Sequence, residues 1–69
     1  MNILEFRAEL ARNGYTMASL AVELGISKKR MYSHLAKENF TQAEISAMAK
    51  ILNLDTNKIM MIFFADKVS

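Results

Sequence analysis

Apolar residues recur along the chain at the three- and four-residue spacing of helices rather than in the alternation of strands. No hairpin turn signal is sustained, and the chain has no proline and only two glycines, Gly14 and Gly25. The pattern therefore predicts an all-α domain of five short helices joined by connections of a few residues. These helices are expected at about residues 2–12, 17–24, 28–36, 42–52 and 56–65.

Local capping signals mark where most of these helices begin and end. The run from Thr41 to Glu44 is a capping box, in which the two end side chains each satisfy a free backbone N–H group. Single N-cap residues are expected at Thr16, Ser27 and Asp55. The first two helices are expected to stop at residues that tolerate the left-handed conformation, which are Asn13, Gly14 and Gly25.

The inward faces of the helices predict the core. In the first helix, Ile3, Phe6 and Leu10 form one stripe, which Leu4 and Ala11 widen. The charged residues of this helix are expected to face water, and they are Glu5, Arg7, Glu9 and Arg12. The buried positions expected in the rest of the chain are Leu20, Ala21, Leu24, Ile26, Met31, Ile45, Met48, Ala49 and Leu52.

Residues 16–31 have the organisation of a helix-turn-helix. Ala21 is small enough to let the second helix lie close beneath the third, and Gly25 turns the chain sharply. Ile26 plugs the angle between the two helices, and Ser27 caps the third. Residues 28–30, which are Lys-Lys-Arg, then occupy the first turn of the third helix. In a DNA-binding helix-turn-helix, this part of the recognition helix meets the base edges.

The pattern Leu20-Ala21 followed by Leu24-Gly25-Ile26-Ser27 resembles the Cro/repressor (XRE) family of phage helix-turn-helix proteins. The C-terminal half, from Phe40-Thr41-Gln42-Ala43-Glu44-Ile45 through Ile62-Phe63-Phe64, resembles small immunity-region proteins of phages from Gram-positive bacteria. The resemblance covers most of the chain. It implies a single lambda-repressor-like domain over residues 1–69, which dimerises on a palindromic operator and regulates transcription in a lysogeny switch.

The resemblance also implies which residues contact DNA. The first two turns of the third helix would read bases, and Lys37 and Asn39 would contact phosphate. The family usually has a glutamine at the start of the second helix, where this chain has Met17, and a hydrophobe late in the third, where it has His34. We expect Met17 to be exposed. The DNA-contacting residues implied are Thr16, Met17, Ser27, Lys28, Lys29, Arg30, Tyr32, Ser33, Lys37 and Asn39.

The charge pattern supports a local basic surface. The formal net charge is only +2, yet Lys28, Lys29, Arg30 and Lys37 fall within ten residues that contain no acid. The alternative is a solvated helix face, as many short charge runs are. Cations in the first turn oppose the helix dipole, so their position there favours a contact with DNA over a role in stability.

The C-terminal helix carries more apolar residues than one buried face can hold. Met60 and Met61 are neighbours, so they cannot both face the same way as Ile59 and Phe63. The alternative is that a small domain leaves some apolar side chains exposed. We expect a protein interface here, most simply in a homodimer. Its expected residues are Ile59, Met60, Met61, Phe63 and Phe64, with Met17 as a separate candidate.

A rival function from another class is an antirepressor, which would bind the DNA-binding domain of a cognate phage repressor and block its operator contacts. Met17 and the methionine-rich tail motivate this hypothesis, because methionine adapts to protein surfaces. Both functions are non-covalent. Repressor release by the protein, without DNA binding of its own, would favour the rival.

Other function classes find no support in the residues. The chain has no cysteine and one histidine, so we expect no disulfide, zinc site or cofactor. His34 lies near serines without an oriented acid or an oxyanion-hole motif, which argues against an enzyme. The longest apolar run, residues 59–65, is too short for a membrane span, and a bacterial cytoplasmic location is expected. A metal site built from carboxylates is not expected either, because four acidic residues lack the spacing of a metal-binding motif such as an EF-hand loop: Glu38, Glu44, Asp55 and Asp66.

Overall fold

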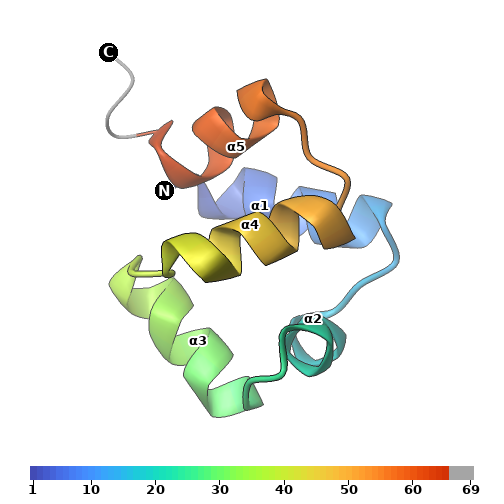
Figure 1. Cartoon of the computed structure of the whole chain (residues 1–69), viewed down its shortest axis with the longest axis vertical. Helices are drawn as coiled ribbons and strands as arrows, with labels where there is room; N and C mark the ends of the chain where they lie inside the picture. Colours follow the sequence, from blue (N-terminus) through green and yellow to red (C-terminus); the bar gives the residue numbers. More distant parts are fainter. Residues whose placement is uncertain (66–69) are drawn as a thin grey trace.

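The computed structural model describes residues 1–65, so Asp66 lies outside the described residues. Within them, the protein is all-α with five helices, as the sequence predicts (Figure 1). The third helix ends one residue later than expected, and the last ends at Phe63 rather than near Ala65. The helices are α1 (Ile3–Arg12), α2 (Met17–Leu24), α3 (Lys28–Lys37), α4 (Gln42–Ile51) and α5 (Thr56–Phe63).

The helices form two groups around α4. Helices α2 and α3 pack against each other at one end of the molecule, while α1 and α5 pack against each other at the other end (Figure 1). Helix α4 packs against both α2 and α5 and so joins the two groups. Helix α3 therefore lies at the periphery, where one of its faces is open to a partner.

Side chains cap the start of every helix in the described chain. The predicted caps Thr16, Ser27, Thr41 and Asp55 each accept a hydrogen bond from a backbone N–H of the first turn. The capping box at Thr41 is confirmed, and α1 gains a further cap from the side chain of Asn2. Gly25 adopts the left-handed conformation at φ +72°, which ends α2 and starts the turn into α3.

The core largely follows the predicted inward faces. Leu20, Ala21, Met31, Met48 and Leu52 are buried as expected. Four further predicted positions are half-buried, and they are Leu24, Ile26, Ile45 and Ala49. The stripe of α1 is narrower than predicted, because Leu4 is 82% exposed and only Phe6 and Leu10 are buried on it.

A cluster of aromatic rings joins the first and last helices, α1 and α5, to the loop after α3. The rings of Phe6, Phe40 and Phe63 lie with centroids 6.0 to 6.3 Å apart, in tilted or edge-to-face arrangements. The ring of His34 meets Phe40 edge-on at 5.8 Å. Aromatic pairs at these distances add to the stabilisation from burial alone, so the cluster fixes the loop against α1 and α5.

The expectation that Met17 is exposed is wrong. Its side chain is 6% exposed and belongs to the core cluster. The physical reason is helical spacing: Leu20, Ala21 and Leu24 lie three, four and seven residues further on, so Met17 shares their inward face. Met17 is thus a core residue and is removed from both the DNA-contacting and the protein-interface sets.

The expectation that Glu9 faces water is also wrong. Glu9 is 5% exposed, and its carboxylate accepts hydrogen bonds from Arg12 on α1 and Lys58 on α5. Arg12 and Lys58 also pair with Glu5, so the four charges form one network between α1 and α5. The network compensates the burial of the Glu9 carboxylate, which would otherwise be costly.

The network makes stability depend on pH. The hydrogen bond from Lys58 outweighs the effect of burial and, with Arg12, holds the pKa of Glu9 below its ordinary value of 4.5. Because the folded pKa is depressed, this stabilisation is complete above about pH 4.5 and is lost as the pH falls through the folded pKa. We expect Glu9→Gln to cost about 1–3 kcal/mol at neutral pH, and less in acid, in urea unfolding.

Glu23→Gln is the matched control for this measurement. Glu23 is exposed on α2 and forms no ion pair within residues 1–65, so its replacement should leave the free energy of unfolding nearly unchanged at each pH. A loss at Glu9→Gln that is the same at neutral and acidic pH would show that the carboxylate charge is not what holds α1 to α5.

Candidate nucleic-acid interface

Helix α3 turns one apolar face to the core and leaves its basic residues outside. Met31 and Leu35 are buried, and they anchor the helix. Lys28, Lys29 and Arg30 are exposed in the first turn and Lys37 in the last. The predicted base-reading residues therefore lie where a ligand can reach them, and Tyr32 adds an aromatic ring that is 41% exposed.

The cations of α3 differ from Arg12 and Lys58, at the other end of the molecule, in forming no ion pair within residues 1–65. Arg12 and Lys58 form ion pairs with Glu5 and Glu9. Within residues 1–65, none of the four cations of α3 forms an ion pair, and α3 itself contains no acid. The helix therefore presents an uncompensated positive surface, although the net charge of the whole chain is small.

The cap of α3 leaves its first turn free for cations. The hydroxyl of Ser27 accepts the backbone N–H of Arg30 at 3.0 Å, so a neutral residue supplies the stabilisation that an acid often gives at this position. The lysines that follow oppose the helix dipole. A sequence selected only for stability would avoid this arrangement, and a polyanionic ligand would compensate it.

Helical spacing places small and basic residues together on the outer side of α3. Lys29, Ser33 and Lys37 follow one another at intervals of four residues, opposite the buried Met31 and Leu35. The half-buried Ser33 separates the two lysines and is short. A basic ridge with a short side chain at its centre can lie close to the floor of a groove.

Two predicted DNA-contacting residues outside α3, Asn39 after this helix and Thr16 before α2, are placed differently with respect to a phosphate contact. Asn39 is exposed in the turn after Glu38, and its backbone N–H donates to the carbonyl of His34 at 3.1 Å. Thr16 is exposed, but its hydroxyl caps α2 by accepting the N–H of Ser19. Asn39 thus keeps its side chain for a ligand, while Thr16 already uses its own.

His34 and Glu44 form a contact that the sequence did not predict. The Nδ1 atom of His34 lies 3.0 Å from the Oε1 atom of Glu44, and the same oxygen accepts the backbone N–H of Thr41 at 2.8 Å. Burial raises the pKa of Glu44, but these partners outweigh it, so the pKa of this carboxyl is lowered. The sequence identified Glu44 only as part of a capping box, because nothing local indicates that His34 lies beside it.

The predicted interface on the last helix divides into two surfaces. Met60 and Met61 are 42% and 45% exposed, and they line one hollow with Asn2 and Asn57. Phe63, in contrast, contributes to the aromatic cluster of the core. The predicted set therefore does not form one continuous face.

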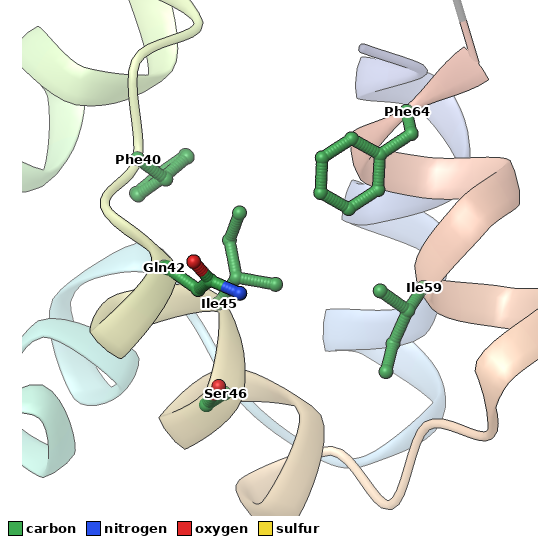
Figure 2. Close-up of a pocket in the computed structure, with 6 residues that line it drawn as sticks. All are labelled: Phe40, Gln42, Ile45, Ser46, Ile59 and Phe64. Atoms are coloured by element: carbon green, nitrogen blue, oxygen red, sulfur yellow. The ribbon is translucent and has the colours of Figure 1, made fainter. Parts of the chain in front are cut away.

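Ile59 and Phe64 face a second hollow, an open pocket of about 430 Å³ (Figure 2). The two residues project from α5 and its end toward Phe40 and Ile45 on the opposite wall. Gln42 and Ser46 supply the polar side chains of its lining, which includes no charged residue among residues 1–65.

Residues 1–65 contain no group of three histidine or carboxylate side chains placed to hold a metal ion. None of the helices in this range has the length and apolar character needed to cross a lipid bilayer. The chain matches no protein-family model, no curated protein and no solved structure.

Proposed function

We propose that this protein is a sequence-specific DNA-binding transcriptional regulator that places α3 in the major groove. The observation that carries the proposal is the contrast between its cations. Four cations within the ten residues of α3 are exposed and unpaired within residues 1–65, whereas Arg7 is a single unpaired cation on α1, and Arg12 and Lys58 are neutralised by carboxylates. The helix-turn-helix arrangement of α2 and α3 supports it, since this motif presents its second helix to DNA.

The proposed contacts divide into two kinds. The major groove admits an α-helix, and Lys28, Lys29 and Ser33 would meet base edges there. Lysine donors suit the O6 and N7 acceptors of guanine, so a half-site containing guanine is expected. Lys37 and Asn39, at the end of α3, would contact phosphates and set the register without reading sequence.

A second copy of the chain would give the operator its symmetry. One α3 covers only one half-site, and helix-turn-helix dimers read two half-sites about 34 Å apart. The exposed Met60 and Met61 on α5 offer an apolar surface for this purpose, at the end of the molecule opposite α3 (Figure 1). Pairing through α5 would leave both copies of α3 free for DNA.

The antirepressor remains a second candidate function, with less support than the sequence suggested. Met17 no longer favours it, because this side chain is in the core. Exposed Met60 and Met61 still favour a protein partner, since methionine surfaces adapt to different shapes. Release of a repressor from its operator by this protein, with no DNA binding of its own, would favour the antirepressor.

Binding to duplex DNA tests the proposal directly. A duplex selected from a random pool by the wild-type protein would serve as the probe, and fluorescence anisotropy would give the dissociation constant. Lys29→Ala is expected to cost about 1–3 kcal/mol on the selected duplex and little on unrelated DNA, because it removes a base contact. Lys37→Ala should weaken binding to both and lower the salt slope by about one, because it removes a phosphate contact.

Arg7→Ala is the control for these variants. Arg7 is an exposed cation of α1, a helix that packs against α5 (Figure 1), and it forms no ion pair within residues 1–65. The Arg7→Ala substitution should leave the affinity for DNA and its salt dependence unchanged. If the three variants behave alike, the attraction to DNA comes from overall charge, and α3 is not the interface.

A further inference from the structure

The end of α3 is tied to α4 by one polar contact between two largely buried side chains. His34 lies in the last turn of α3, and Glu44 lies in the first turn of α4. Their side chains are 17% and 11% exposed, and the Nδ1 and Oε1 atoms are 3.0 Å apart. In residues 1–65, this is the one side-chain hydrogen bond that joins α3 to another helix.

Besides this hydrogen bond, α3 is held by apolar contacts and by the ion pair between its C-cap residue Glu38 and the N-terminal amine, 2.7 Å apart, which does not join it to another helix. Met31 and Leu35 enter the core through apolar contacts, which are not directional, and methionine adapts easily to a shifted helix. A hydrogen bond to a carboxylate has a preferred distance and angle. The contact between His34 and Glu44 therefore restricts both the rotation of α3 about its axis and its angle to α4.

Both partners are themselves held in place. The Glu44 oxygen that meets His34 also accepts the backbone N–H of Thr41, so the start of α4 fixes this carboxylate. The His34 ring stands edge-on against Phe40, which belongs to the aromatic cluster of the core. A rigid frame thus extends from the core, through the loop before α4, to the end of α3.

We propose that His34 and Glu44 are a positioning pair, which holds α3 at the angle that presents Lys29, Ser33 and Lys37 to DNA. The proposal rests on the proposed function, since the angle matters only if α3 enters a groove. Neither side chain needs to touch DNA, so the pair acts through the helix that it orients. This assigns a role to His34 that is separate from base reading and from catalysis.

The decisive variant is His34→Leu, which keeps an apolar side chain against Phe40 but removes Nδ1. Two measurements apply to it. Residual dipolar couplings of the backbone amides report the orientation of α3 relative to α4 in the free protein, and anisotropy reports affinity for the selected duplex. We expect altered couplings confined to α3 and an affinity loss of about fivefold, equivalent to one net hydrogen bond. Thermal unfolding would confirm that the variant is folded during both measurements.

Glu44→Gln and the double variant test whether the two residues act together. Glutamine keeps an oxygen that can accept the backbone N–H of Thr41, so Thr41 should still cap α4, while the negative charge that faces His34 is lost. The double variant is expected to bind DNA no more weakly than His34→Leu alone. Affinity losses that simply add would show that the residues act separately, which contradicts a pair.

Glu5→Gln is the control, because Glu5 pairs with Arg12 and Lys58 at the other end of the molecule. It should leave both the α3 couplings and the DNA affinity unchanged. Unaltered couplings in His34→Leu, with wild-type affinity, would overturn the proposal. If the wild-type protein binds no DNA, the proposed function fails, and the couplings alone still decide whether the pair orients α3.

Discussion

Replacing Met17 with aspartate is expected to unfold most of the protein at room temperature. Met17 is 6% exposed and lies among the side chains of Leu20 and Ala21 in the core. A carboxylate at this position would have neither water nor a cationic partner, which costs about 4 kcal/mol or more. The stability of a domain of 69 residues is itself about 3–10 kcal/mol. Far-ultraviolet circular dichroism and urea unfolding would measure the loss of helix.

The neighbouring substitution Ala18→Asp is the matched control. Ala18 is exposed in the first turn of the same helix, so the new carboxylate would remain in water and would interact favourably with the helix dipole. Its stability should stay within about 1 kcal/mol of wild type. A folded Met17→Asp variant as stable as Ala18→Asp would show that the start of α2 does not pack on the core.

The second large effect is expected from Leu20→Ala. Leu20 is fully buried, so its truncation removes apolar contacts and leaves a cavity between α2 and its neighbours, at a cost of about 3–5 kcal/mol. Leu24 lies one turn further along α2 but is half-buried. Leu24→Ala should cost less, about 1–2 kcal/mol, because water reaches the site and part of the side chain is already exposed.

Urea unfolding of these two variants gives the comparison directly. Both variants replace a leucine with alanine in the same helix, so the change in helix propensity is the same for each. The linear dependence of the free energy on urea concentration should keep its slope, while the midpoint falls further for Leu20→Ala. Equal losses would mean that burial does not distinguish the two positions, and would contradict the packing of α2 described above.

Features that depend on neighbouring residues were predictable from the sequence. A cap is a contact between a side chain and a backbone group three residues away, and four predicted N-caps are confirmed. The turn at Gly25 is local as well, since it depends on one left-handed residue. For the same reason, the number of helices and their order follow from the pattern of residues.

The features that the sequence did not predict depend mostly on contacts between residues far apart in the chain. Glu9 is buried beside Lys58, which lies 49 residues further along the chain, and nothing near Glu9 indicates this partner. The pair of His34 and Glu44 likewise depends on how the loop between α3 and α4 folds back. Met17 is a different case, because the spacing to Leu20 and Leu24 already favoured burial, and the expected role of its position outweighed that signal.

The methionines of the protein differ in how readily an oxidant can reach them. Met17, Met31 and Met48 are shielded in the core, whereas Met60 and Met61 on α5 are accessible. Oxidation converts an apolar thioether into a polar sulfoxide and is fastest at accessible sulfurs. An oxidant that reaches the folded protein would therefore change the α5 surface first and leave the α3 surface intact, so that any subunit or partner contact made through α5 would be lost before the fold.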